Sequence, residues 1–188
     1  MNENTKSRLQ RNYGQPANRT DANVSETGNG SMPGDAMPAG SPTVNALSVD
    51  VEEYFQVWAL SKVTERNGWE AYPSRVCSSV EKILDLMDVA GAKATFFTLG
   101  WIAERHPNLV RRIADSGHEV ASHGYAHAKI TSQGPDEFRA DVIRAKTILE
   151  DVTGRPVLGY RAPSFSIGDK TLWALDILQE TGHLYSSS

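Results

Sequence analysis

The chain has 188 residues and a formal net charge of −4, with 19 Lys and Arg against 23 Asp and Glu. This mildly acidic balance argues against nucleic-acid binding, which depends on clustered basic side chains. A single cysteine, Cys77, excludes an internal disulfide framework. The sequence has no apolar run near the roughly 20 residues that a membrane helix needs, and its first residues lack the apolar core of a signal peptide. We therefore expect a globular chain without an integral membrane segment, and a cytoplasmic location by default.

Residues 1–44 differ in composition from the rest of the chain. They are rich in Asn, Gly, Ser, Thr and Pro, and their few large apolar residues are scattered. Such a segment buries too little apolar surface to offset the entropy lost on ordering. The composition therefore predicts a disordered tail over residues 1–44 and one domain over residues 45–188.

The domain alternates between short β-rich runs and amphipathic helical patterns. The predicted strands cover residues 46–50, 94–99, 118–122, 157–160 and 183–186. The predicted helices cover residues 76–87 with Gly91 as a stop, 107–116 with Gly117 as a stop, 135–152, and 169–181 with Gly182 as a stop. Repeated strand–helix–strand units predict an α/β fold with a parallel sheet of about five strands.

Two carboxylates close the first predicted strand. Parallel sheets carry their chemistry at the carboxyl ends of the strands. Side chains alternate along a strand, so Asp50 and Glu52 point to one side if the strand continues, while Glu53 points away. Two carboxylates on one side suit a metal ligand and a general base, although an isolated pair also fits a solvated acidic loop.

Histidine and arginine follow the third and fourth predicted strands. His123 and His127 are four residues apart, a spacing that brings both imidazoles to one side on a helical turn. Neutral imidazole is the commonest nitrogen ligand of zinc. Arg161 comes directly after the fourth strand, where a guanidinium can orient a carboxylate.

Together these residues predict metal-assisted hydrolysis. Two imidazoles and one carboxylate leave positions open on a zinc ion, which is the layout of a catalytic site. The spare carboxylate accepts the proton of a water that the metal has made acidic. We expect one divalent metal ion, with zinc favoured, although cobalt, nickel and iron suit similar ligands.

Three motifs carry a family resemblance. They are Ser48-Val49-Asp50-Val51-Glu52, His123-Gly124-Tyr125-Ala126-His127 and Arg161-Ala162-Pro163. Over residues 45–188 the sequence resembles the polysaccharide deacetylase family, also called the NodB homology domain or carbohydrate esterase family four. Residues 48–56 and 159–166 resemble a subgroup that is encoded beside exosortase-linked exopolysaccharide genes.

The resemblance implies a distorted (β/α) barrel that removes acetyl groups from an N-acetylated polysaccharide or oligosaccharide. It makes Asp50 the general base, His123 and His127 metal ligands, and Arg161 the residue that holds Asp50. The backbone N–H near Ser164 would help to bind the oxyanion.

Two positions depart from the family pattern near the first and fifth strands. Val51 stands where the family has a second Asp, so Glu52 is the better candidate for the third metal ligand. The chain ends inside the fifth predicted strand, and Ser186 stands where the subgroup has an Asp. The family's last motif, with a histidine that acts as general acid, lies beyond Ser188. We therefore expect a partial barrel that is incomplete at its C-terminus.

Two alternatives to the deacetylase stay open, and the oligomeric state is undetermined. One is a noncatalytic truncated remnant, and the other is a related amidase acting on a small non-sugar amide. His118 and His183 are expected to be surface or capping residues. Trp58 and Trp69 lie downstream of the first motif, where they either stack on sugar rings or pack in the core.

Overall fold

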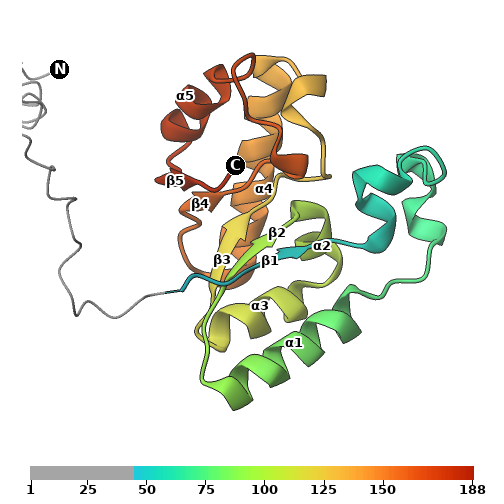
Figure 1. Ribbon diagram of the computed structural model, residues 1–188, viewed down its shortest axis with the longest axis vertical. Helices are drawn as coiled ribbons and strands as arrows, with labels where there is room; N and C mark the ends of the chain where they lie inside the picture. The colour runs from blue at the N-terminus through green and yellow to red at the C-terminus, as the bar shows by residue number, and fades with distance from the viewer. Residues whose placement is uncertain (1–44) are drawn as a thin grey trace, which may run out of the picture. The chain divides into compact units, whose positions relative to one another are not determined.

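The computed structural model describes residues 45–188, and the tail predicted over residues 1–44 lies outside them. In the described residues, five parallel strands form one sheet in the order β1-β2-β3-β4-β5 (Figure 1). The strands span Ser48–Val51 (β1), Thr95–Thr98 (β2), Glu119–Ser122 (β3), Gly159–Tyr160 (β4) and Tyr185–Ser186 (β5). All five predicted strands are present, although β4 and β5 are shorter than predicted, and the α/β class is confirmed.

Five α-helices lie between the strands in this part of the chain. They span Val76–Ala90 (α1), Gly100–Arg105 (α2), Pro107–Asp115 (α3), Pro135–Thr153 (α4) and Trp173–Glu180 (α5). The predicted stop at Gly91 is confirmed, because this residue ends α1 in the left-handed region, with φ at 61°. None of the helices described here has both the length and the apolarity to cross a bilayer.

The helix prediction differs from the structure in two places. We predict a helix from Asp169, but α5 begins at Trp173. The Thr171 hydroxyl accepts a hydrogen bond from the Gly168 N–H at 2.9 Å and donates to the Ser166 carbonyl at 3.1 Å, which stabilises a turn instead. The sequence does not predict α2 or the 3-10 helices η2 (Tyr54–Gln56), η3 (Trp58–Leu60) and η4 (Arg66–Ala71) between β1 and α1. Elements this short show no helical period.

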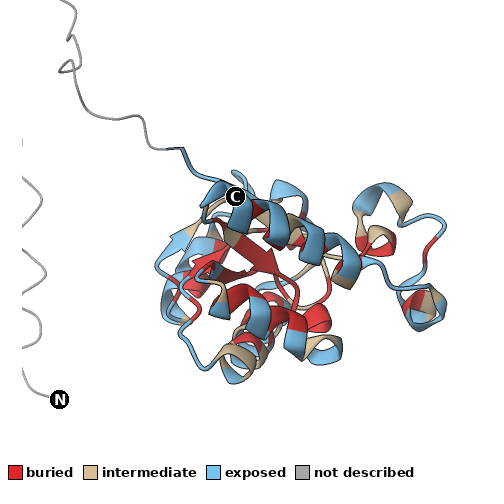
Figure 2. Ribbon diagram, turned by 90° about the horizontal axis from the view of Figure 1, so that it is seen from below, coloured by how far each residue is buried: buried red, intermediate tan, exposed pale blue. Residues whose placement is uncertain are grey.

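The two faces of the sheet have different surroundings. Val51, Phe96 and Val120 point to the face that packs against α1 and α3 and belong to the larger hydrophobic core. Asp50 and Phe97 are aligned across β1 and β2 and point to the opposite face. Figure 2 shows the buried residues gathered on the strands and on the helix surfaces turned toward them.

The sheet is strongly curved. Arg161 follows β4, three strands from β1, and neighbouring flat strands about 4.8 Å apart would leave roughly 14 Å between them. Nevertheless its guanidinium donates hydrogen bonds to Asp50 Oδ1 at 2.6 Å and to Ser48 Oγ at 2.9 Å. The same group donates to Ser187 Oγ, beyond β5, at 2.9 Å. Both edges of the sheet therefore converge on one side chain, as in part of a (β/α) barrel.

Two histidines expected at the surface are buried. His118 and His183 are each 5% exposed. The Ala94 N–H donates to His118 Nδ1 at 3.2 Å, and burial lowers the pKa of this histidine. Burial also lowers the pKa of His183 to about 4, and the charge of Lys146 acts in the same direction. Both residues are therefore held as neutral imidazoles because the core excludes the water that would solvate a charge.

Lowering the pH from about 6.5 to about 4 is expected to destabilise the fold through His183. In this window the unfolded chain binds a proton at His183 and the folded chain does not, so the unfolded state gains stability as the pH falls. The check is urea denaturation at pH about 7 and about 5, with His183→Asn expected to show the smaller difference in unfolding free energy. An equal pH dependence in both proteins would contradict the assignment.

Candidate metal centre

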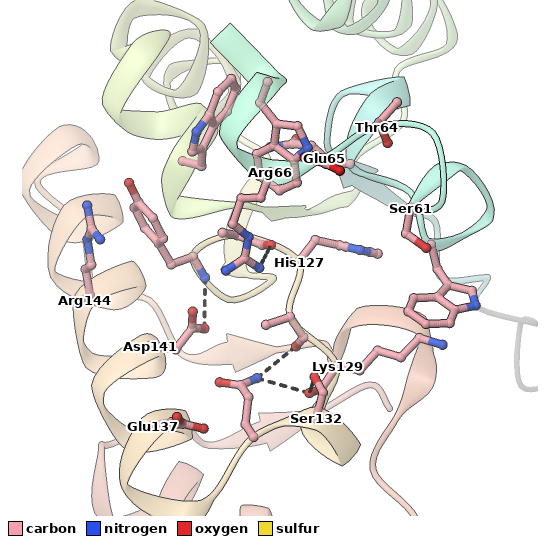
Figure 3. A pocket seen from close by; sticks show the side chains of 18 of the residues that line it. Ser61, Thr64, Glu65, Arg66, His127, Lys129, Ser132, Glu137, Asp141 and Arg144 are labelled. Carbon is pink, nitrogen blue, oxygen red and sulfur yellow. Dashed lines mark hydrogen bonds between the residues drawn. The ribbon is translucent and has the colours of Figure 1, made fainter.

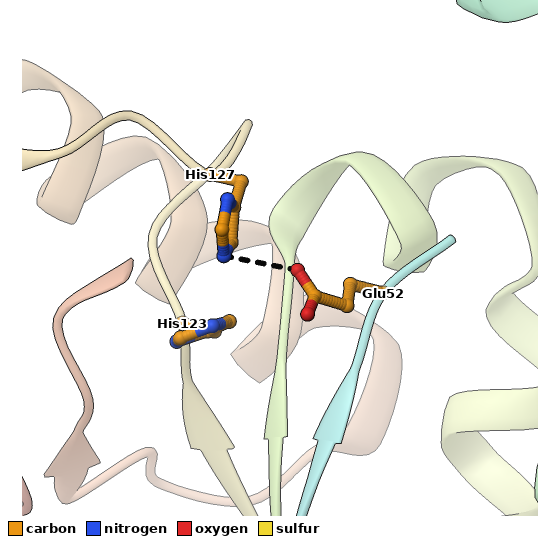
Figure 4. Close-up of side chains that lie close together, drawn as sticks. All are labelled: Glu52, His123 and His127. Atoms are coloured by element: carbon orange, nitrogen blue, oxygen red, sulfur yellow. Dashed lines mark ion pairs between the residues drawn. The ribbon is translucent and has the colours of Figure 1, made fainter. Parts of the chain in front are cut away.

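Three candidate ligands lie above the carboxyl ends of β1 and β3, the strands on either side of β2. Glu52 follows β1 directly, His123 follows β3 directly, and His127 lies in the connection from β3 to α4 (Figure 4). One ligand atom from each residue lies within 4.8 Å of the other two. His127 Nε2 is 3.0 Å from Glu52 Oε2, and the two imidazole centroids are 5.1 Å apart. The structure therefore brings together the three residues that the sequence predicts as metal ligands.

The segment between the two histidines is an irregular loop, which corrects the helical turn predicted from their spacing. Gly124 and His127 both have positive φ, at 76° and 54°. A Cβ on Gly124 would lie 2.8 Å from Asp141 Oδ2, so only glycine fits there without displacement. The Tyr125 N–H donates to the same Asp141 oxygen at 3.0 Å, which ties the loop to α4.

The hydrogen bonds of His123 fix its tautomer. Its Nδ1 lies 2.8 Å from the Arg161 carbonyl, which can only accept, so Nδ1 carries the proton and Nε2 presents a lone pair. Burial lowers the pKa of His123, which keeps the ring neutral and able to bind a metal.

The donor set fits a divalent cation. Among the described residues, buried His123 Nε2 has no hydrogen-bond partner, and buried Glu52 Oε2 has only the ion-pair contact with His127 Nε2. Buried polar atoms are rarely left unsatisfied, so an unpaired imidazole nitrogen beside a buried carboxylate suits a site for a positive ion. Two imidazole nitrogens and one carboxylate oxygen are the ligand types that zinc takes in catalytic sites.

Asp50 lies beside the three ligands and is held by Arg161. One carboxylate oxygen accepts from the guanidinium at 2.6 Å, and the other lies 4.0 Å from His123 Nε2. The guanidinium itself packs on the Phe97 ring, 4.0 Å from its centroid. The Asp50 side chain keeps 29% of its surface exposed, and among the described residues its second oxygen accepts no hydrogen bond from the guanidinium.

Ser164 lies in the 3-10 turn η6 (Pro163–Phe165), close in sequence to Arg161. Ser164 and Phe165 both have positive φ, at 56° and 51°, and the Phe165 N–H donates to the Ala162 carbonyl at 2.9 Å. Non-glycine residues in this region are strained, and such strain is common at functional sites. The oxyanion role of the Ser164 N–H stays a prediction.

Two carboxylates, Glu53 and Asp141, stabilise the segments around the centre, and the sequence motifs do not predict these roles. Glu53 points away from Asp50 and Glu52, as predicted, and its 1% exposed side chain accepts from the backbone N–H groups of Arg75 and Val76 at the start of α1. Asp141 is on α4, where burial raises its pKa. Its position three residues after Phe138, on the apolar side of the helix, is the signal that could have identified it.

Comparison of the sequence with known protein families gives a match over most of the described residues. The family model described as polysaccharide deacetylase matches residues 69–184, a range that contains His123, His127 and Arg161 and begins after Asp50 and Glu52. The chain belongs to the polysaccharide deacetylase family. The more specific resemblance to the exosortase-linked subgroup stays a prediction.

One relative and two solved structures illustrate the similarity. A peptidoglycan-N-acetylglucosamine deacetylase of Bacillus cereus is 38% identical over 96 residues, which are 50% of this chain and 35% of that protein. The Bc1960 peptidoglycan N-acetylglucosamine deacetylase aligns with a TM-score of 0.55 at 27% identity, over 75% of this chain and 55% of that one. BA3943, a family pseudoenzyme of Bacillus anthracis, aligns with a TM-score of 0.58 at 20% identity, over 75% of this chain and 41% of that one.

These numbers have two consequences. The similarity to BA3943 shows the fold alone. The chain spans about a third of the length of the B. cereus relative. The residues of the candidate centre, and not the fold, therefore have to carry a proposal about activity.

Proposed function

We propose that this protein is a metal-dependent hydrolase that removes N-acetyl groups from a polysaccharide or oligosaccharide. One observation carries the proposal: Glu52, His123 and His127 bring one ligand atom each within 4.8 Å of one another, beside an Asp50 that Arg161 holds. Family membership and the names of relatives such as the B. cereus peptidoglycan-N-acetylglucosamine deacetylase support it.

The proposed metal ligands are Glu52, His123 and His127. Zinc is the proposed ion, because two neutral imidazoles and a carboxylate are its usual donors in hydrolytic sites. A divalent cation held there supplies a Lewis acid, which polarises a carbonyl and makes water a better nucleophile at neutral pH. The Arg161 carbonyl supports this role by fixing the proton on the far nitrogen of His123.

Asp50 is the proposed general base. Its free oxygen takes the proton of the attacking water while Arg161 keeps the other oxygen in place. The water oxygen forms a bond to the acetyl carbon, the proton taken by Asp50 passes to the amide nitrogen as the C–N bond breaks, and the products are acetic acid and a free amine on the sugar. The Ser164 N–H is the proposed donor to the oxyanion that forms on the acetyl oxygen.

Asp50→Asn is expected to lower the rate of acetate release by about 10²- to 10⁴-fold, the usual contribution of a general base. The assay uses the full chain with added Zn²⁺ and a tetramer of N-acetylglucosamine, with acetate measured enzymatically. The amide side chain of this variant keeps an oxygen for Arg161, so the site geometry is preserved while the base is lost.

The matched control is Asp151→Asn, on the exposed surface of α4, which is expected to leave acetate release unchanged. Equal loss in both variants would contradict the role of Asp50. Zinc binding without acetate release from the unaltered chain would contradict the proposed activity and favour the noncatalytic alternative. Release of acetate from small non-sugar amides but not from the tetramer would favour the amidase alternative.

A further inference from the structure

The loop that carries His127 is held through its backbone by several other segments. At the start of α2, the Gly100 N–H donates to the Gly124 carbonyl at 2.9 Å. The next N–H, that of Trp101, donates to the Tyr125 carbonyl at 2.9 Å. The first N–H groups of a helix have no partner within the helix, so they are free to bind these carbonyls. The start of α2 therefore holds the first half of the loop.

Two side chains hold the second half of the loop. Asp141, on α4, accepts a hydrogen bond from the Tyr125 N–H at 3.0 Å. Arg66, in η4 of the β1–α1 connection, donates from its guanidinium to the Ala126 carbonyl at 2.8 Å (Figure 3). Ala126 is 4% exposed, and among the described residues no other donor binds its carbonyl. Arg66 and Asp141 therefore bind backbone groups of the two residues that directly precede His127.

The orientation of the His127 ring depends on this backbone. The His123 ring is fixed by a hydrogen bond of its own, because its Nδ1 lies 2.8 Å from the Arg161 carbonyl. Within the described residues, the His127 ring has no hydrogen bond at Nδ1, and its polar contact is that of Nε2 with Glu52 at 3.0 Å. His127 also has φ at 54°, a conformation that persists in a non-glycine residue only where the surroundings impose it. The bonds to residues 125 and 126 therefore orient His127, as the Arg161 carbonyl orients His123.

Arg66 is itself held in place. Its guanidinium lies over the Trp69 ring, 5.5 Å from the centroid. Trp69 is 6% exposed and packs edge-on against Trp101 of α2, with 5.7 Å between the ring centroids. Burial raises the pKa of Asp141, whereas the nearby charge of Arg66 acts in the opposite direction. Side chains from the β1–α1 connection, α2 and α4 therefore form one linked support around the loop.

We propose that Arg66 and Asp141 are positioning residues, which hold the backbone of residues 125–126 so that the His127 imidazole points at Glu52 and His123. The inference rests on the proposed function, because it takes these three residues as the metal ligands. It adds that the β1–α1 connection, which is remote in sequence from both histidines, sets the affinity and the geometry of the metal centre. Neither Arg66 nor Asp141 belongs to the ligand set, so neither is assigned a catalytic role.

The first test is the zinc affinity of the full chain, measured by competition with a chromogenic chelator. Arg66→Met removes the donor and keeps the length of the side chain, and Asp141→Ala removes the acceptor. We expect each variant to bind zinc at least about tenfold more weakly, because loss of an outer-shell partner of a metal site costs about 10- to 100-fold. Arg66→Lys keeps the positive charge and N–H donors, so it is expected to bind zinc more tightly than Arg66→Met.

Arg155→Met is the matched control. Arg155 is exposed, as Arg66 is, and its guanidinium also donates to a backbone carbonyl, that of Ala114, at 2.6 Å. This bond joins α3 to the segment before β4, at the end of the sheet opposite to the metal ligands. Urea denaturation is expected to show a comparable loss of unfolding free energy in Arg66→Met and Arg155→Met, while Arg155→Met leaves the zinc affinity of the folded chain unchanged.

A second measurement uses Co²⁺ in place of Zn²⁺, because its visible absorption depends on the arrangement of the ligands. At saturating Co²⁺, Arg66→Met is expected to change this spectrum and Arg155→Met is not. Zinc affinity and spectra that Arg66→Met and Asp141→Ala leave unchanged, or change no more than Arg155→Met does, would overturn the positioning role and leave the metal centre standing. Zinc affinity that depends on both residues, without acetate release from the unaltered chain, would support the positioning role and contradict the proposed activity. No zinc binding by the unaltered chain would overturn the metal centre and the positioning role together.

Discussion

Glu52→Gln is expected to lower the affinity of the chain for Zn²⁺ by at least about a hundredfold, because loss of an outer-shell partner alone costs about 10- to 100-fold. The substitution keeps the size of the side chain and removes its negative charge. Glu52 Oε2 is buried and lies 3.0 Å from His127 Nε2, so its charge is directed at the imidazoles of the candidate centre. The measurement is competition with a chromogenic chelator, together with the metal content of the purified protein.

The same variant separates a metal ligand from a structural residue. The contact of Glu52 with His127 is offset by the cost of burying its charge, so Glu52→Gln is expected to leave the unfolding free energy of the metal-free chain nearly unchanged. Zinc raises the unfolding free energy of a protein that binds it only when folded. This zinc-dependent increase is expected to be smaller in Glu52→Gln than in the unaltered chain. Unchanged zinc affinity in Glu52→Gln would show that Glu52 is not a ligand.

Glu53→Gln is expected to lower the unfolding free energy by about 3 kcal/mol, the scale of breaking a buried, charge-assisted hydrogen-bond network. The Glu53 carboxylate accepts from the Arg75 N–H at 3.0 and 3.1 Å, from the Val76 N–H at 3.3 Å, and from the Ser74 hydroxyl. These donors stand at the first turn of α1, where a negative charge is favoured by the helix dipole. The glutamine side chain of the variant has only one acceptor oxygen. Its NH2 group would face the backbone N–H groups of Arg75 or Val76, which are also donors.

Adjacent carboxylates thus provide a matched pair. Urea denaturation of the metal-free chain is expected to show a loss in Glu53→Gln and none in Glu52→Gln. Zinc titration of the folded proteins is expected to show the reverse order. A loss of zinc binding in folded Glu53→Gln as large as in Glu52→Gln would contradict the division of roles between them.

Local sequence patterns predict part of the geometry of the candidate metal centre. Alternation along the first strand places Asp50 and Glu52 on one side and Glu53 on the other, and the structure agrees because pleating is a local property of the backbone. The spacing of His123 and His127 predicts that the rings meet, and they do, but through a loop and not a helical turn. The loop depends on Asp141, which binds the Tyr125 N–H from a helix 16 residues away in sequence. No local pattern contains such a contact.

By itself the sequence determined the order of the five strands and of four of the five α-helices, and the residue types of the candidate centre. These follow from apolar periodicity, turn residues and local motifs, which act over a few residues. Only the tertiary structure decided that Arg161 reaches Asp50 across a curved sheet and that His183 is buried without charge. It also decided that Trp58 stays exposed while Trp69 packs in the core. Exposure, pKa and ligand distances depend on which distant segments exclude water from a side chain, and this is settled only when the layers pack together.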